Sequence, residues 1–348
     1  MIYFNNDYSE GCHEKILEAL VRTNLEQTPG YSEDHYCARA AEKIRKACGQ
    51  ENLTVHFMVG GTQTNMTVIS AALRPHQGAL CPVSGHINGH ETGAVEATGH
   101  KVLTVPSADG KITAKQVEDV VLAHRADASF EHVVQPKLVY ISNPTEWGTI
   151  YSKAELQALS ETCHKLGLYL FLDGARLGYG LTCGENDLTL ADIAQLCDVF
   201  YIGGTKVGAL FGEAIVFSNP VLAEDFRYIM KQKGGMLAKG RLLGLQFDVL
   251  MEDDLYFKIA EKANRLAAQL RATFEELQIP FLVSSPTNQL FPILPEAVLE
   301  ELKKTYCFVD MGQVDENHRC VRFCTSWATK QENVDALCAD LRRICDRG

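Results

Sequence analysis

The stretch from Leu168 to Arg176, LYLFLDGAR, decides the fold class of this chain. Its first five residues are uniformly apolar, and such short runs are typical of strands buried on both faces of a parallel sheet. The run ends at Asp173, a carboxylate at the end of the expected strand. Before the stretch, Ser152 and Glu155 match the capping box that begins a helix, and Gly167 is placed to end that helix.

Helical and strand-like segments alternate on both sides of this stretch. We expect a helix from Ser32 to Ala47, capped by Ser32 and ended at Gly49. The other expected segments are strands at 54–58, 101–105, 137–142, 198–202 and 213–218, a helical run from Thr62 to about Leu73, and a helix at 113–124. Short apolar strands separated by helices predict a mainly parallel sheet covered by helices on both faces.

The pattern changes past about Gly240. A long region rich in Ala, Leu, Glu, Lys and Arg predicts helical structure as far as Leu277. Beyond it we expect strands around 281–283, 290–294 and 321–324, and helices at 296–304 and 330–344. We therefore expect three parts, namely an N-terminal arm over residues 1–30, a large domain over 31–245 and a small α+β domain over 246–348.

The composition argues against several classes of protein. Of the 348 residues 46% are apolar, which is too many for a disordered chain. The net charge of -11 and the lack of a basic run argue against a nucleic-acid partner. The N-terminus lacks the pattern of a signal peptide, and no apolar run reaches transmembrane length. We therefore expect a cytoplasmic protein with no membrane partner.

Twelve cysteines form no recognisable metal or redox motif. No CxxC pair occurs, and the closest two are Cys320 and Cys324. Several cysteines lie inside apolar runs, where the residue behaves as a small hydrophobic side chain. We expect reduced thiols that serve packing, and no bound metal.

Three loops at expected strand ends carry chemically unusual residues: Gly60-Gly61-Thr62, Asp173-Gly174-Ala175-Arg176 and Gly203-Gly204-Thr205-Lys206. The first loop precedes a helix and is either an anion-binding cup or an ordinary tight turn. Asp173 either receives an N–H group of a ligand, caps a helix or pairs with Arg176. Lys206 is either a desolvated nucleophile or an exposed loop lysine.

Together the three loops meet the requirements of pyridoxal phosphate. Its phosphate needs N–H donors, its ring nitrogen needs an anion, and its aldehyde needs a lysine amine. Ligands of such sheets gather at the carboxyl ends of the strands, where all three loops lie. Between the cup and the carboxylate, His86 could stack on the ring and act as acid or base. With His90 four residues on, a shared helix face and a metal pair are the alternatives.

The motifs GGTQTN at 60–65, the His86 segment, DGAR at 173–176 and GGTK at 203–206 follow one another in an order that resembles the threonine aldolase family. The resemblance extends over nearly the whole chain, from Asn5-Asn6-Asp7 to Val321-Arg322-Phe323. It implies the aspartate-aminotransferase-like fold type I of pyridoxal phosphate enzymes, in the β-eliminating lyase branch. That fold is α/β, with a mainly parallel seven-stranded sheet in the large domain and a smaller C-terminal α+β domain. The resemblance also implies a homodimer or homotetramer with the site at the interface.

By this resemblance each motif has a role. Lys206 would bond to the cofactor's aldehyde, Asp173 would pair with the ring nitrogen, and His86 would stack over the ring, which makes these three the predicted catalytic residues. The predicted cofactor-binding residues are Gly61, Thr62, His86, Asp173, Arg176, Thr205 and Lys206, and the predicted substrate-binding residues are Asn6, Tyr31, Glu146, Arg176 and Arg322. Arg176 and Arg322 would bind the substrate carboxylate. Tyr31, and either Lys233 or Lys239, would reach the site of the neighbouring subunit.

One loop departs from the family pattern. Many threonine aldolases carry a histidine near the substrate hydroxyl, whereas residues 143–148 here read NPTEWG. The base is therefore left open among Glu146, a water molecule, His86 and His90. The resemblance implies retro-aldol cleavage of β-hydroxy-α-amino acids, with L-threonine or L-allo-threonine giving glycine and acetaldehyde. β-Elimination or transamination with the same cofactor is the alternative, and a non-catalytic protein that retains the fold is a further one.

Overall fold

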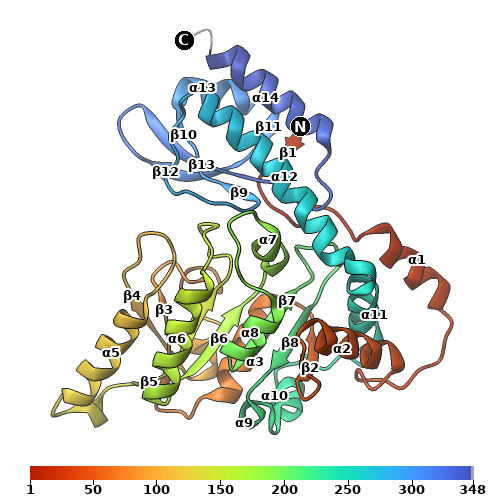
Figure 1. The fold of residues 1–348 in the computed structure, drawn as a ribbon, viewed down its shortest axis with the longest axis vertical. Helices are drawn as coiled ribbons and strands as arrows, with labels where there is room; N and C mark the ends of the chain where they lie inside the picture. Colours follow the sequence, from red (N-terminus) through yellow and green to blue (C-terminus); the bar gives the residue numbers. More distant parts are fainter. Residues whose placement is uncertain (346–348) are drawn as a thin grey trace.

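A seven-stranded sheet in the order β2-β8-β7-β6-β5-β3-β4 forms the centre of the computed structural model, which describes residues 1–345 (Figure 1). Its strands are β2 (Thr54–Met58), β3 (Gln77–Pro82), β4 (Lys101–Val105), β5 (Gln135–Ser142), β6 (Tyr169–Asp173), β7 (Val199–Gly203) and β8 (Glu213–Phe217). Strand β8 pairs antiparallel with β2 and β7, and the other neighbours pair parallel. The predicted mainly parallel sheet of seven strands is confirmed.

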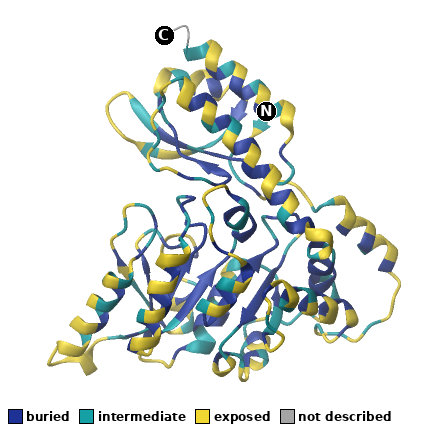
Figure 2. Cartoon of the chain, viewed as in Figure 1, coloured by how far each residue is buried: buried dark blue, intermediate teal, exposed yellow. Residues whose placement is uncertain are grey.

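Helices cover both faces of this sheet, and its central strands are accordingly buried on both sides, whereas the edge strands β2 and β4 are partly exposed (Figure 2). One face packs against α3 (Gly61–Ala72), α9 (Pro220–Ala223) and α10 (Phe226–Gln232). The other packs against α2 (His35–Ala47), α5 (Ala114–Ala126), α6 (Lys153–Leu166), α8 (Leu190–Leu196) and α11 (Arg241–Leu250). The uniformly apolar strands thus have the double burial that their sequences predict.

A second lobe lies at the far end of the long helix α12 (Leu255–Glu276), which extends from the sheet into it (Figure 1). Its elements are β9 (Gln289–Leu290), β10 (Ile293–Pro295), α13 (Glu296–Leu302), β11 (Tyr306–Cys307), β12 (Val309–Gln313), β13 (His318–Cys324) and α14 (Gln331–Cys345). The chain's first strand, β1 (Ile2–Tyr3), pairs with β11, and Phe4 lies in the core of this lobe. The N-terminus is therefore tied to the C-terminal lobe.

The remaining elements are α1 (Glu14–Thr23), α4 (His86–Gly89), α7 (Leu177–Thr182) and the 3-10 turns Glu96–Thr98, Phe130–His132 and Glu252–Asp254. The predicted capping box at the start of α6 is confirmed, because Ser152 accepts a hydrogen bond from the N–H of Glu155 and the Glu155 side chain accepts one from the N–H of Ser152. Gly167 ends the helix in the left-handed conformation, with φ of 73°.

Several predicted boundaries are wrong. Asp34, not Ser32, caps α2, because its carboxylate accepts the N–H of Cys37 while Ser32 adopts a positive φ in the loop before it. The predicted helical region from about Gly240 to Leu277 is interrupted at Asp253 and Asp254, whose backbones are left-handed. Residues 281–283 form only an isolated bridge from Phe281 to Pro292, and the expected strand 290–294 is split between β9 and β10.

Strand β3 and helix α1 are two of the elements that were not predicted. Strand β3 is fully buried, but its sequence QGALCP contains glycine and proline, which weaken the signal of a strand. Helix α1 lies in the segment assigned to an N-terminal arm, and its buried residues are Ile16, Ala19 and Thr23. This spacing of three and four is the amphipathic pattern that reveals the helix.

Within residues 1–345 no helix is long and apolar enough to cross a membrane. The same part of the chain contains no group of three or more His, Cys, Asp or Glu side chains arranged to hold a metal ion. Nine cysteines are buried as free thiols: Cys37, Cys48, Cys81, Cys163, Cys183, Cys197, Cys320, Cys324 and Cys338.

Candidate active site

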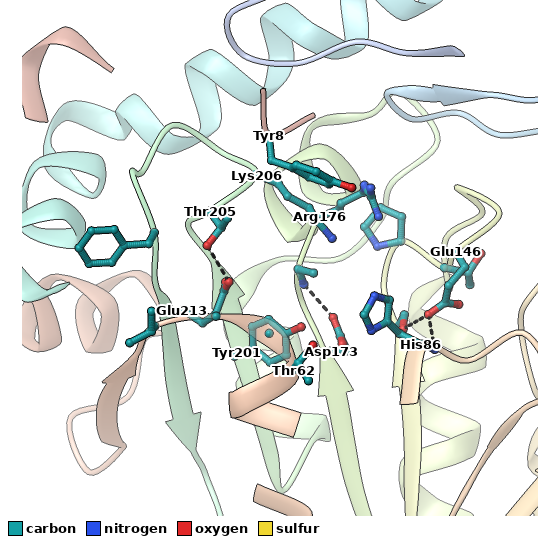
Figure 3. Close-up of a pocket in the computed structure, with 18 residues that line it drawn as sticks. Tyr8, Thr62, His86, Glu146, Asp173, Arg176, Tyr201, Thr205, Lys206 and Glu213 are labelled. Carbon is teal, nitrogen blue, oxygen red and sulfur yellow. Dashed lines mark hydrogen bonds between the residues drawn. The ribbon is translucent and has the colours of Figure 1, made fainter. Parts of the chain in front are cut away.

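A cavity of about 310 Å³ lies where β5, β6 and β7 end, between the sheet and the C-terminal lobe (Figure 3). Residues from seven separate segments line it, since the parallel strands direct their carboxyl ends to the same edge. The predicted site residues that it brings together are Gly61, Thr62, His86, Glu146, Asp173, Arg176, Thr205 and Lys206. The sequence places these residues up to 145 positions apart, and the fold gathers them.

Asp173 ends β6 as a buried carboxylate. Its Oδ1 accepts the N–H of Ala175 at 2.9 Å, and its Oδ2 accepts the Tyr140 hydroxyl and the Asn65 amide, the latter at 3.0 Å. Burial alone would raise the pKa of Asp173, but the charge of His86 and the hydrogen bonds of Tyr140 and Tyr201 outweigh it and lower that pKa. Asp173 is therefore an ionised carboxylate with a fixed position at the wall of the cavity.

Lys206 extends into the same cavity from the loop after β7, close to Tyr8 and Arg176 (Figure 3). Burial and the neighbouring guanidinium of Arg176 lower the pKa of Lys206 against the opposing charges of Asp7, Asp173 and Glu213. Among residues 1–345 its ammonium group forms no ion pair. A lysine with a lowered pKa and no ion pair is the kind of amine that attacks carbonyl groups.

Arg176 is fixed by a residue from the N-terminal segment. Its Nε and Nη2 donate to the two carboxylate oxygens of Asp7 at 2.7 and 3.0 Å, and Asp7 is fully buried. Burial would raise the pKa of Asp7, but Arg176 and Lys206 lower it overall. Asn288 of the C-terminal lobe donates to the same carboxylate at 3.0 Å. Arg176 thus has a bidentate anchor that joins three parts of the chain.

His86 begins α4 and is oriented by a buried carboxylate. Its Nδ1 lies 2.7 Å from Oε1 of Glu91, which also accepts the Asn65 amide at 2.7 Å. Burial would lower the pKa of His86, but the hydrogen bond to Glu91 and the charges of Asp173 and Glu91 raise it. Asn65 donates to both Glu91 and Asp173, so one amide links the two acidic groups.

Glu146 lies in the loop after β5, at the wall of the cavity (Figure 3). Its Oε1 accepts the N–H of His86 at 2.9 Å and the Ser142 hydroxyl at 2.7 Å. Its Oε2 is buried and has no hydrogen-bond partner among residues 1–345. Burial raises the pKa of Glu146. The loop therefore holds one carboxylate oxygen in place and leaves the other free.

The glycine loop leads into the first turn of α3. Gly60 precedes the helix and Gly61 begins it, so the first N–H groups of α3 lie at the cavity. A Cβ at Gly61 would come within 3.2 Å of the Tyr201 hydroxyl. Nearby, the Thr205 hydroxyl donates to Oε1 of Glu213 at 2.9 Å. The loop has the shape and the backbone N–H donors expected of an anion-binding cup. The hydroxyl group of Thr205, in contrast, is hydrogen-bonded to the carboxylate of Glu213.

A second cavity of about 540 Å³ adjoins the first and shares five of its residues: Tyr8, His86, Glu146, Arg176 and Lys206. Arg322 of β13 and His90 line this second cavity. Arg322 donates to the carbonyl oxygen of Asn5 at 2.9 Å and to Gln289 at 3.3 Å. Burial and the charges of His86 and Arg322 lower the pKa of His90.

Four predicted residues line neither cavity: Asn6, Tyr31, Lys233 and Lys239. The amide oxygen of Asn6 accepts the N–H of Tyr8 and the Ser9 hydroxyl, both at 2.9 Å. Tyr31 is exposed, with the Lys231 ammonium 4.6 Å from its ring centre. The backbone of Lys233 accepts a hydrogen bond from Gln63, which places it beside α3. The predicted roles of all four stay predictions.

Sequence reasoning missed six residues that shape the site: Asp7, Asn65, Glu91, Tyr140, Tyr201 and Glu213. Two of them had a signal, because a tyrosine inside an apolar strand must direct its hydroxyl to a partner. Tyr140 and Tyr201 occupy such positions in β5 and β7, and both support Asp173. The others depend on contacts between distant segments, which spacing does not reveal.

The chain belongs to the β-eliminating lyase family, whose model matches residues 7–296. Its fold is the aspartate-aminotransferase-like fold type I. A single mutant of Thermus thermophilus aspartate aminotransferase superposes with a TM-score of 0.73 over 99% of this chain and 91% of that one. The sequences are only 16% identical, so this likeness shows the fold alone.

Two proteins named as threonine aldolases are more similar. The low specificity L-threonine aldolase of Pseudomonas sp. (strain NCIMB 10558) is 33% identical over 351 residues, which cover 98% of this chain and 97% of the relative. A solved threonine aldolase of Leishmania major is 46% identical, with a TM-score of 0.97 over 99% of this chain and 100% of that one. The resemblance predicted from the motifs is confirmed.

Proposed function

We propose that this protein is a pyridoxal phosphate-dependent aldolase that cleaves β-hydroxy-α-amino acids, with L-threonine or L-allo-threonine giving glycine and acetaldehyde. One observation carries the proposal: a single cavity contains an amine that forms no ion pair within residues 1–345, a buried anionic carboxylate and an anchored guanidinium. The similarity to proteins named as threonine aldolases supports this choice among the chemistries that the cofactor serves.

The residues present fit pyridoxal phosphate. Lys206 would bond to its aldehyde, Asp173 would pair with its ring nitrogen, and His86 would lie over its ring. Gly61 and Thr62, at the start of α3, would hold its phosphate, and a Cβ at Gly61 would lie 3.2 Å from the Tyr201 hydroxyl, a tight contact that favours glycine there. When bound, this cofactor supplies an electron-withdrawing ring that stabilises the carbanion left at Cα when the Cα–Cβ bond breaks.

The substrate carboxylate would bind Arg176 and Arg322. Nε and Nη2 of Arg176 donate hydrogen bonds to Asp7, so Nη1 remains available to bind a substrate. Because Asp7 holds the guanidinium in a fixed plane, little side-chain entropy is lost when the carboxylate binds. Arg322 approaches from β13 on the other side of the second cavity, and its Nε has no hydrogen-bond partner among the described residues.

Glu146 is the residue we favour to remove the proton of the β-hydroxyl group. Its Oε1 is held by two donors while its Oε2 is unpartnered at the cavity wall, so Oε2 can accept a proton without losing another contact. His86 has its Nδ1 engaged by Glu91. A base must lie within hydrogen-bond reach of the proton it takes, and a fixed carboxylate at the wall meets that requirement.

We also infer that the protein is a cytoplasmic homodimer or homotetramer. The cations that line the first cavity are Arg176, Lys206 and the protonated form of His86, and all three have other roles in the proposal. A phosphate dianion in the cup therefore needs a cation from elsewhere, and Lys233 or Lys239 of a second copy is suitable. Light scattering tests the assembly, and a stable monomer with full activity contradicts it.

The product spectrum tests the proposed reaction. Purified protein supplied with pyridoxal phosphate should release glycine and acetaldehyde in equal amounts from L-threonine. β-Elimination would release pyruvate and ammonia from serine or cysteine, and transamination would release a 2-oxo acid. Pyruvate and ammonia without any glycine would mean that the aldolase proposal is wrong.

A further inference from the structure

A second buried acid lies at the phosphate end of the cavity, where an anion is expected to bind. Glu213 is the first residue of β8 and is buried, and its side chain lines the same cavity as Gly60, Gly61 and Thr205 (Figure 3). A carboxylate beside a phosphate dianion is unfavourable, since two like charges repel strongly where water is excluded. The position of Glu213 therefore needs an explanation.

Glu213 accepts two hydrogen bonds from the loop after β7. Its Oε2 accepts the N–H of Gly204 at 3.1 Å, and its Oε1 accepts the Thr205 hydroxyl at 2.9 Å. The Thr205 oxygen in turn accepts the N–H of Gly212 at 3.0 Å. A hydroxyl group has a single proton, so Thr205 cannot donate to Glu213 and to a phosphate at the same time.

Glu213 has no ion-pair partner within residues 1–345. Burial raises the pKa of Glu213 to about 8, although the hydrogen bond of Thr205 and the charge of Lys206 oppose this shift. The ionisable groups that face it are Lys206 from its own loop, Asp173 from β6, Tyr201 from β7 and Tyr256 from α12. Of these, Lys206 is the one cation, and its own proton is weakly held.

We propose that Glu213 is a positioning residue that binds the cofactor's phosphate in its protonated form, through Thr205. As a carboxylic acid, Glu213 donates its own proton to Oγ1 of Thr205 and still accepts the N–H of Gly204. Thr205 then accepts from Glu213 and from Gly212, which leaves its hydroxyl proton free for a phosphate oxygen. The inference rests on the proposed function, because the anion concerned is the phosphate of pyridoxal phosphate.

This rearrangement breaks no hydrogen bond around Glu213. Three hydrogen bonds keep their partners, and only the direction of the Thr205–Glu213 bond is reversed. Where Glu213 is ionised before binding, one proton is taken up from the solvent as the phosphate binds. Binding therefore weakens as the pH rises, because the ionised form must first be protonated.

Glu213→Gln is the decisive variant. A glutamine in the same rotamer accepts the N–H of Gly204 through its oxygen and donates to Thr205 through its nitrogen, which copies the protonated acid at every pH. The probe is 4-deoxypyridoxine 5′-phosphate, which has the ring and the phosphate but no aldehyde, so bonding to Lys206 does not contribute. Its Kd for the apoprotein is measured by calorimetry from pH 6.5 to 9.5.

We expect wild type and Glu213→Gln to bind the probe equally at pH 7. At pH 9 the wild-type Kd should exceed that of the variant by about tenfold, as expected for one group of pKa about 8. Protonation of the probe itself cancels in this ratio. Glu224→Gln, an exposed change of the same charge, should behave as wild type.

Two outcomes would overturn the inference. A wild-type Kd that exceeds that of Glu213→Gln by one constant factor from pH 6.5 to 9.5 would mean that Glu213 stays ionised when the probe binds. Weaker binding by Glu213→Gln at every pH would mean that the carboxylate itself is required, as it would be if Glu213 paired with a cation of a second subunit. If the glutamine variant does not fold, Thr205→Val provides the test, since removing the hydroxyl should weaken binding at pH 7 and bring the ratio of the variant Kd to the wild-type Kd closer to one as the pH rises.

Failure of the cofactor assignment, on which the proposed function rests, has a different result. Wild-type protein would then bind the probe at no pH and would show no visible absorbance with pyridoxal phosphate. The proposed role of Glu213 would then be wrong as well, because it depends on the bound phosphate. A protein that binds the cofactor but shows equal Kd values for wild type, Glu213→Gln and Thr205→Val at every pH contradicts the inference alone.

Discussion

Asp173 and Lys206 share one cavity, yet they form no ion pair with each other among the described residues. Burying two unpaired ionisable groups destabilises a protein unless hydrogen bonds offset the loss of hydration. Three hydroxyl and amide donors from Tyr140, Tyr201 and Asn65 stabilise Asp173. Within residues 1–345 no hydrogen bond stabilises the amine of Lys206 in this way, so the amine is available to bind a ligand.

Glu146→Gln tests the base at the residue scale. Removing a positioned base should lower the rate of threonine cleavage by about 10²- to 10⁴-fold. Exchange of the α-proton of glycine needs no β-hydroxyl base, so the same variant should exchange this proton at close to the wild-type rate. The two rates are measured side by side, by product release and by NMR in deuterated water.

The pH profile gives an independent test of Glu146. The residue acts in its ionised form, and burial raises its pKa, so kcat/KM of the wild type should fall as the pH drops through that raised pKa. The fall should be absent from the residual activity of Glu146→Gln. Equal losses of cleavage and of glycine exchange would show that Glu146 supports the whole site rather than the base step.

At the scale of elements, the ends of β6 and β7 approach each other closely at Gly174. A Cβ at Gly174 would overlap the carbonyl oxygen of Tyr201, and the carbonyl of Gly174 accepts the N–H of Gly203 at 2.9 Å. Gly174→Ala must therefore move Asp173 away from β7. We expect a loss of about 1–3 kcal/mol in the free energy of unfolding, together with weaker cofactor binding.

Gly184→Ala is the matched control for this change. No atom lies within 4 Å of a Cβ built at Gly184, so the same substitution should leave stability and cofactor affinity unchanged. Urea unfolding of both variants measures the difference. A Gly174→Ala protein as stable as wild type would show that the approach of the two strand ends is not required.

The sheet was predictable from sequence because its strands are apolar on both sides and its helices carry recognisable caps. Ser152 and Glu155 form the capping box, and LYLFL forms the buried strand, as their chemistry requires. Strand β3 escaped prediction because glycine and proline obscure its pattern. The break at Asp253 and Asp254 also escaped, because both residues adopt left-handed backbones within a segment of high helix propensity.

The site was predictable only where a motif directs a residue to a strand end. Asp173 and Lys206 follow apolar strands directly, so their convergence follows from a parallel sheet. Glu213 begins the antiparallel strand β8, and its contact with Thr205 depends on how β7 and β8 pair. Asp7 is separated from Arg176 by 169 positions, and no local pattern could reveal that pair.

At the scale of the whole molecule, the N-terminal segment holds the two lobes and the site together. β1 pairs with β11, Phe4 packs in the core of the C-terminal lobe, and Asp7 bonds Arg176 and Asn288. Substrate binding at Arg176 is thus coupled to both lobes. The predicted boundaries at residues 30 and 245 stay predictions, but the first residues of the chain clearly contact the C-terminal lobe.

Asp7→Asn should weaken both stability and substrate binding. Breaking a buried ion pair leaves Arg176 uncompensated and costs about 3–5 kcal/mol. Because Arg176 lowers the pKa of Asp7 in the folded state, this stabilisation is fully present above the unfolded value of 3.8 and is lost as the pH falls through the lower folded value. The difference between wild type and Asp7→Asn in urea unfolding should therefore be large at pH 7 and shrink below pH 3.8. A difference that does not change with pH would contradict this assignment.

The most direct test of the central claim is the covalent bond between Lys206 and pyridoxal phosphate. Purified protein is mixed with the cofactor, its visible spectrum is recorded, and the carbon–nitrogen double bond is reduced with borohydride before peptide mass analysis. The account predicts a visible absorbance band and a single modified peptide, the one that contains Lys206, with neither in Lys206→Ala. A colourless protein, or modification of other lysines without Lys206, would contradict it.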